Sequence, residues 1–165
     1  MGWLEYIFAK AKCKEKAREP LGFFPPKRPI NKVFIHCSAS DNPAHDNIEI
    51  IRQWHYARGF NDVGYHYYIN KNGVVYDGRD VELAPAAQSG FNRGTIAICV
   101  GGLESFTPES LEVLKDACIE IRDTYKRKGH VVTFHGHNEV NPHKTCPVFD
   151  YKEILKLDKQ GNLGI

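Results

Sequence analysis

The spacing of hydrophobic and polar positions changes several times along the chain, and each change predicts an element. Short runs rich in β-branched and aromatic residues predict strands at 33–35, 64–69, 74–76, 94–100 and 130–134. Apolar residues that recur every three or four positions predict helices at 48–58, 107–129 and 151–157. Strands that alternate with helices predict an α/β fold, in which one mixed central β-sheet is flanked by helices.

The same spacing predicts which side chains face the core. In the first strand, a period of two places Phe34 and His36 on one face and Val33 and Ile35 on the other. The run 94–100 is almost wholly apolar, which is typical of a strand covered on both faces.

Two further local patterns give more specific expectations. In helix 48–58 we expect Ile50, Ile51 and Trp54 to form the inward stripe. Between the runs 64–69 and 74–76, Asn72 and Gly73 should supply the positive φ values of a tight hairpin turn.

The N-terminal segment differs from the rest, and we divide the chain into an appendage at 1–31 and a domain at 32–165. Residues 2–19 have the pattern of a cationic amphipathic helix, and three prolines in 21–29 favour an extended connector. We expect this N-terminal helix to pack on the domain, with a membrane-surface or protein contact through residues 2–19 as the alternative. The segment lacks the basic start and cleavage site of a secretory signal, so we expect synthesis in the cytoplasm.

Composition narrows the function classes. The 165 residues are 42% hydrophobic and 25% charged, which fits one globular domain, and no stretch approaches the roughly 18 apolar residues that span a bilayer. A net charge of +2 is too small for a nucleic-acid-binding surface. Five irregularly spaced cysteines argue against a disulfide framework, and Cys37, Cys99 and Cys118 fit small buried hydrophobic residues.

Cys146 differs from these cysteines because it lies in a polar loop, and together with His36 and His137 it forms a candidate zinc site. Two imidazoles and one thiolate leave the fourth tetrahedral position for water, as in catalytic zinc sites, which predicts a hydrolase. His135 in place of Cys146 is a less favoured ligand set, and His143 is a second competitor.

The remaining histidines carry no comparable pattern. His66 alternates away from Tyr65, so we expect a packed imidazole that supports the site without binding the metal. His45, His55 and His130 fit surface or helix-side positions, because no other candidate ligand accompanies them in the sequence.

Six ordered motifs between about 31 and 150 resemble the zinc-dependent N-acetylmuramoyl-L-alanine amidases of the peptidoglycan recognition protein superfamily, most closely the small phage lysozyme type. They are the segments 35–38, 51–55, 59–66, 77–79, 101–102 and 136–147. The resemblance implies hydrolysis of the amide between the lactyl group of N-acetylmuramic acid and L-alanine in peptidoglycan. It places His36, His137 and Cys146 on the zinc ligands, and Tyr65 and Lys144 on catalytic positions.

The chemistry of these residues agrees with the implied roles. One bound Zn²⁺ per chain would supply a water nucleophile at neutral pH, and Lys144 could stabilise the oxyanion that forms. Tyr65 has an ordinary pKa near 10, so we assign it to orienting the nucleophile or the developing charge.

Two departures from the family pattern concern the substrate. His137 and Cys146 are nine positions apart, one more than expected, so the loop should bulge near 141–143. The segment 84–92 lacks a histidine that commonly contacts substrate, and Phe91 and Asn92 are the remaining candidate contacts there.

Two alternatives stay open within the superfamily: a non-catalytic peptidoglycan-binding module and a partner-binding regulator. Cys146 favours the enzyme, because many non-catalytic members lack the thiolate ligand. An amidase of this kind would act on the cell wall, in the periplasm or outside, after release or delivery.

Overall fold

The computed structural model describes residues 20–165, and the amphipathic helix predicted at 2–19 lies outside the described residues. Five strands form one sheet in the order β3-β2-β4-β1-β5. They are β1 (Lys32–Cys37), β2 (Tyr67–Ile69), β3 (Val75–Asp77), β4 (Thr95–Val100) and β5 (Thr133–Gly136). All neighbouring pairs are parallel except β2 and β3, so the predicted mixed sheet is confirmed.

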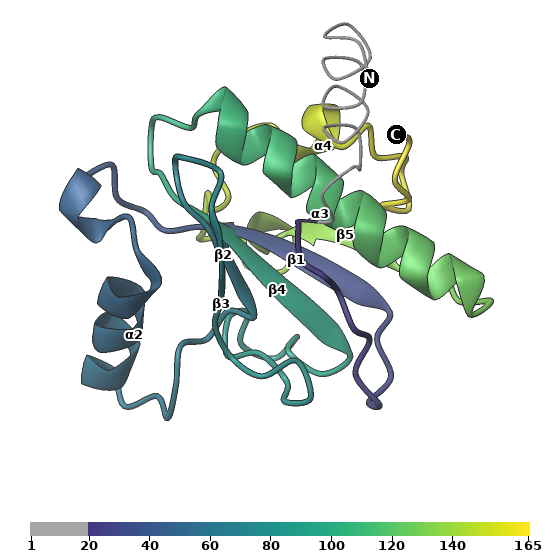
Figure 1. Ribbon diagram of the computed structural model, residues 1–165, viewed down its shortest axis with the longest axis horizontal. Helices are drawn as coiled ribbons and strands as arrows, with labels where there is room; N and C mark the ends of the chain where they lie inside the picture. The colour runs from purple at the N-terminus through teal and green to yellow at the C-terminus, as the bar shows by residue number, and fades with distance from the viewer. Residues whose placement is uncertain (1–19) are drawn as a thin grey trace, which may run out of the picture.

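Helices lie on both sides of this sheet (Figure 1). They are α2 (Ile48–Ala57), α3 (Pro108–Arg127) and α4 (Tyr151–Ile154), with the 3-10 turns η1 (Pro43–His45) and η2 (His137–Glu139). This is the α/β architecture that the alternating pattern predicts. No helix within residues 20–165 combines the length and the apolar character needed to cross a bilayer.

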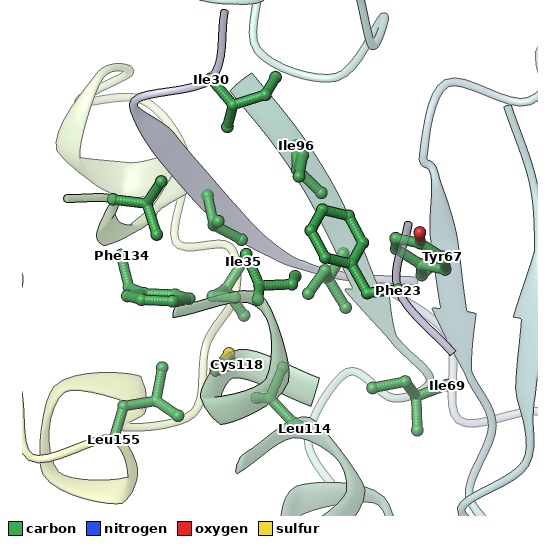
Figure 2. Close-up of a cluster of buried hydrophobic side chains, with 14 of the residues drawn as sticks. Phe23, Ile30, Ile35, Tyr67, Ile69, Ile96, Leu114, Cys118, Phe134 and Leu155 are labelled. Carbon is green, nitrogen blue, oxygen red and sulfur yellow. The ribbon is translucent and has the colours of Figure 1, made fainter. Parts of the chain in front are cut away.

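The main core fills the space between α3 and one face of the sheet (Figures 1 and 2). Val33 and Ile35 of β1 point into it, as the period of two predicts. Leu114, Cys118 and Ile121 meet them from α3, and each is fully buried. Because a buried Leu or Ile side chain contributes roughly 1.5–3 kcal/mol, this face supplies much of the stability.

α2 covers the opposite face, but through a narrower contact than expected. Its buried positions are Ile48, Ile51 and His55, whereas Ile50 is half-buried and Trp54 is 36% exposed. The predicted inward stripe is therefore correct for Ile51 and wrong for Trp54. Hydrophobicity misplaced the stripe because a histidine occupies one of the three inward positions.

The β2–β3 hairpin forms as predicted, with the amide of Gly73 donating to the carbonyl of Asn70 at 2.9 Å. Of the two turn residues Asn72 and Gly73, only Gly73 has a positive φ, +75°, so the expectation for Asn72 is wrong. Several element bounds also differ: β1 extends beyond 33–35, β2 is shorter than 64–69, β5 lies at Thr133–Gly136 where 130–134 was expected, and α4 is shorter than 151–157. β5 begins at Thr133 because this is its first residue that pairs with β1, opposite Lys32, whereas the apolar run already begins near 130.

The proline-containing connector packs closely on the domain. Phe23 and Ile30 are buried in the main core, and the amide of Leu21 donates to the Glu120 carboxylate of α3 at 3.0 Å. Arg28 donates to the carbonyl oxygens of Val81 at 2.7 Å and Thr95 at 2.8 Å. This segment therefore contributes to the fold, while the boundary at 31 and 32 stays a prediction.

Candidate metal and catalytic site

β1 and β5 are parallel neighbours, and this pairing brings two histidines to the same edge of the sheet. Ile35 pairs with Gly136, and the residue after each is a histidine. His36 is the buried member, with 1% of its surface exposed, and His137 opens η2. Their ring centroids are 4.7 Å apart. The site thus forms at the carboxyl ends of parallel strands, where open α/β sheets usually bind ligands.

Cys146 reaches the same point from the loop after β5. The carbonyl of Cys146 accepts a hydrogen bond from the amide of Asn138 at 2.8 Å, and its sulfur accepts one from the amide of Cys37 at 3.2 Å. Cys146 Sγ lies 3.8 Å from Nδ1 of His36. The structure therefore brings together the three residues that the sequence singled out.

The three potential ligand atoms of His36, His137 and Cys146 all lie within 4.8 Å of one another. A tetrahedral zinc ion with bonds of about 2.0–2.3 Å holds its ligand atoms about 3.3–3.8 Å apart. A small inward movement of these side chains would meet that requirement. The donor set of two nitrogens and one sulfur is also one that zinc accepts, so the residues fit the ion.

The loop between His137 and Cys146 accommodates its nine-residue spacing in a turn. The amide of Lys144 donates to the carbonyl of Asn141 at 3.0 Å, and the amide of His143 donates to the Asn141 side chain at 3.1 Å. This turn lies where the sequence predicts a bulge. It leaves the Lys144 side chain exposed on the wall of the groove described below.

Electrostatics keep both imidazoles neutral at pH 7. Burial, assisted by the neighbouring His137, lowers the pKa of His36 to about 3. Burial and then Lys144 lower the pKa of His137. A hydrogen bond with Cys37 and burial raise the pKa of Cys146, so the thiol keeps its proton unless a cation lies beside it. A coordinated metal removes such a proton.

Tyr65 lies next to the three candidate ligands. Its ring centroid is 5.2 Å from that of His36 and 5.4 Å from that of His55. Burial raises the pKa of Tyr65 well above its ordinary value, so its hydroxyl is a proton donor in hydrogen bonds.

The sequence placed His55 at a surface or helix-side position, and the structure shows that it lies on the buried side of α2. It is 6% exposed, and its Nδ1 accepts a hydrogen bond of 2.7 Å from the amide of Gly64. This contact fixes the backbone beside Tyr65. The sequence did not predict this hydrogen bond, because the partner is a loop amide nine positions away and no local pattern indicates it.

An open groove of about 610 Å³ runs past the three candidate ligands. Its walls include Trp54, Arg58, Tyr65, Leu103, His143 and Lys144. It offers aromatic, apolar and cationic surfaces.

The two alternative ligands lie elsewhere. Nδ1 of His135 lies 2.7 Å from Oε2 of Glu139, and Nε2 lies 2.7 Å from Oγ1 of Thr133. Within residues 20–165, the potential metal group includes neither His135 nor His143. His143 is exposed on the groove wall.

Two histidines that are not candidate ligands, His66 and His45, differ in their surroundings. His66 is fully buried and packed, bonded to the backbone of Leu83 and Ala97. His45 is half-buried and hydrogen-bonded to Ser40 at 2.8 Å.

Of the two candidate substrate contacts, Phe91 has an exposed ring, and Asn92 uses its side-chain oxygen within the protein. Neither residue lines the groove. Sequence reasoning overlooked Gln88 in the same segment. It is fully buried, and its Oε1 lies 2.9 Å from Nε2 of His36.

A mixed sheet with two imidazoles and a thiolate beside an open groove defines a candidate metal-dependent hydrolase. Comparison with known proteins identifies the family. Residues 26–149 match the N-acetylmuramoyl-L-alanine amidase family, and the chain belongs to this family. The endolysin of Enterobacteria phage K11 is 33% identical over 141 residues, which cover 81% of this chain and 90% of the relative.

Solved structures agree. The endolysin and N-acetylmuramoyl-L-alanine amidase LysCS from Clostridium intestinale URNW is similar with a TM-score of 0.68 and 25% identity, over 78% of this chain and 83% of that one. The complex of peptidoglycan recognition proteins LCa and LCx with tracheal cytotoxin shares the fold, with a TM-score of 0.66 and 20% identity, over 86% and 90%. The predictions of this superfamily, of the amidase and of peptidoglycan hydrolysis are confirmed.

Proposed function

We propose that this chain hydrolyses the amide between the lactyl group of N-acetylmuramic acid and L-alanine with one zinc ion held by His36, His137 and Cys146. The observation that supports this most directly is the convergence of three ligand atoms within 4.8 Å of one another beside a groove. When bound at such a site, zinc supplies a water nucleophile at neutral pH and polarises the scissile carbonyl. Nδ1 of His36 and Sγ of Cys146 are the atoms that face each other across the site.

Lys144 and Tyr65 supply the charge and the hydrogen bond that amide cleavage needs. Lys144 lies on the groove wall near His137, where its ammonium group can stabilise the negative charge that develops on the carbonyl oxygen. Tyr65 also lines the groove, and its hydroxyl is available as a hydrogen-bond donor, because a phenol whose pKa lies above 10 stays protonated at neutral pH. Both residues line the same groove as His137 and Cys146.

Peptidoglycan is the substrate, and the groove is the part of the surface that we propose to hold it. Trp54 is 36% exposed there and offers a flat apolar surface, while Arg58 and Lys144 are available to anionic groups. Phe91 and Asn92 remain proposed contacts outside the groove. We further propose that the enzyme acts on the cell wall after release, as an endolysin does.

The test is product analysis on intact sacculi. Wild-type protein should bind about one zinc per chain and release new N-terminal L-alanine without new reducing sugar ends. Cys146→Ser should lose zinc and activity together, whereas Cys118→Ser should retain both. Cys118 is the matched control because it is buried in α3, away from the groove, where a serine hydroxyl can bond back to the helix. Reducing ends without amine release would end the amidase proposal.

A further inference from the structure

Gln88 is a fully buried polar side chain in contact with a proposed metal ligand. Its Oε1 lies 2.9 Å from Nε2 of His36, and none of its surface is exposed. It belongs to the segment 84–92, which lacks the histidine that the family resemblance implies there. A buried amide must have its hydrogen bonds satisfied, so the partners of Gln88 reveal which end of the amide faces His36.

The partners of the other amide end fix this orientation. Nε2 of Gln88 donates to Thr95 Oγ1 at 2.8 Å and to the Phe91 carbonyl at 3.3 Å. A carbonyl can only accept. The Thr95 hydroxyl donates its own hydrogen to the carbonyl of Asn92 at 2.8 Å, so it presents a lone pair to Gln88. Both contacts therefore require the NH₂ end, and the oxygen end must face His36.

An acceptor opposite Nε2 of His36 determines the tautomer of that ring. The hydrogen of the neutral imidazole must lie on Nε2, where it donates to Gln88, and Nδ1 then carries the lone pair. Nδ1 is the atom that lies 3.8 Å from Cys146 Sγ. We propose that Gln88 is a positioning residue that holds His36 as the Nε2–H tautomer and so presents Nδ1 to the metal. The second half of this proposal depends on the proposed zinc site.

The loop that carries Gln88 is itself anchored. Oδ1 of Asn92 accepts hydrogen bonds from the amides of Ala87 at 3.1 Å and Gln88 at 2.9 Å. Asn92 thus holds the backbone, while Thr95 at the start of β4 holds the side chain. A chain of hydrogen bonds thus runs from Asn92 through Thr95 and Gln88 to His36. Removing such a partner of a ligand histidine costs about 10- to 100-fold in metal affinity.

Zinc affinity of the full chain, measured by competition with a chelator, gives the first test. Gln88→Leu removes the acceptor and should raise the zinc Kd by about 10- to 100-fold. Gln88→Glu keeps an acceptor opposite Nε2, and its buried carboxyl, when protonated, donates to Thr95 or Phe91 as the amide does, so this variant should recover most of this affinity. Gln160→Leu is the matched control, because Gln160 is exposed far along the chain, and its Kd should equal that of wild type. Equal Kd values for Gln88→Leu and wild type would overturn the positioning role.

The second test reads the tautomer directly, without metal or activity. In ¹⁵N-histidine-labelled protein freed of metal, the signals of His36, assigned with His36→Asn, should show hydrogen on Nε2 in wild type and Gln88→Glu. Gln88→Leu, or Thr95→Val if the former does not fold, should give a mixture of tautomers. Hydrogen on Nδ1 in wild type, or unchanged tautomers in the variants, would refute the proposal. The Nε2–H tautomer in a wild-type protein that binds no zinc would refute only the proposed metal site.

Discussion

His66 provides a quantitative test of how buried imidazoles make this fold sensitive to acid. The ring is 1% exposed, and Nδ1 accepts a hydrogen bond of 3.0 Å from the amide of Ala97. Nε2 therefore carries the hydrogen and donates to the carbonyl of Leu83 at 2.8 Å. Protonation would place a second hydrogen on Nδ1, directly opposite the N–H of Ala97. The neutral ring thus joins β4 to Leu83, the residue before the segment 84–92.

Burial lowers the pKa of His66 to about 4, and the positive charges of Arg28 and Arg79 act in the same direction. The ordinary histidine pKa of about 6.5 applies to the unfolded chain. A difference of roughly 2.5 units at 1.36 kcal/mol per unit corresponds to about 3 kcal/mol of stability. Because the unfolded chain binds the proton more readily, this contribution is complete above pH 6.5. It is lost progressively as the pH falls to about 4.

The assay is urea unfolding at pH 7.5 and pH 4.0 with a chelator present, so that metal binding does not contribute. His66→Asn preserves an acceptor for Ala97 but cannot titrate, so its loss of stability between the two pH values should be about 3 kcal/mol smaller than that of wild type. His130→Asn serves as the control because His130 is exposed, and its pH dependence should match wild type. Equal pH dependence in His66→Asn and wild type would refute the reasoning.

Three further measurements test the packing of Gly64, the role of Lys144 and the pH dependence of activity. Gly64→Ala places a Cβ 2.2 Å from the carbonyl oxygen of Ala86, so urea unfolding should show a loss of about 1–3 kcal/mol; an unchanged midpoint would contradict this packing. Lys144→Ala should lower kcat by about 10²–10³-fold while the zinc content stays near one per chain, and a parallel loss of zinc would argue against an oxyanion role. Activity should decline as the pH falls, because Cys146, whose thiol pKa is raised, must lose its proton to hold the metal, whereas the lowered pKa values of His36 and His137 keep both imidazoles neutral below pH 6; a flat profile down to pH 4 would exclude this ligand set.

The elements that could be predicted from sequence are those with a periodic core contact. The apolar run of β4 predicts a strand covered on both faces, and all six of its residues are buried in the structure. The apolar residues of α3 recur along one side, which predicts a helix. The convergence of His36 and His137 was also predictable, since the strands that carry them both lead into the site at their carboxyl ends. Because a strand has a fixed rise per residue and alternating side chains, the position of a residue in the sequence predicts its position on the sheet.

Two polar side chains whose burial the sequence did not predict, Gln88 and His55, have hydrogen-bond partners that no regular pattern places beside them. Gln88 reaches His36 from a loop with no repeating pattern, and the distance of 52 residues between them leaves no local signal. His55 is polar, so a hydrophobic stripe could not include it, although its hydrogen bond to Gly64 makes burial acceptable. Both omissions arise because burial of a polar group depends on a distant partner.

The two faces of β1 divide stability from function, and this division explains why the site tolerates so many buried polar groups. Val33 and Ile35 pack on the α3 side, where the apolar core is continuous. His36 points to the opposite side, where α2 leaves part of the sheet open to the groove. A polar network there does not interrupt the main core, so Gln88 can fix one imidazole without weakening the packing around α3. Substitutions on the α3 face should therefore change unfolding midpoints in proportion to lost volume, while substitutions in the His36 network should change metal affinity more than stability.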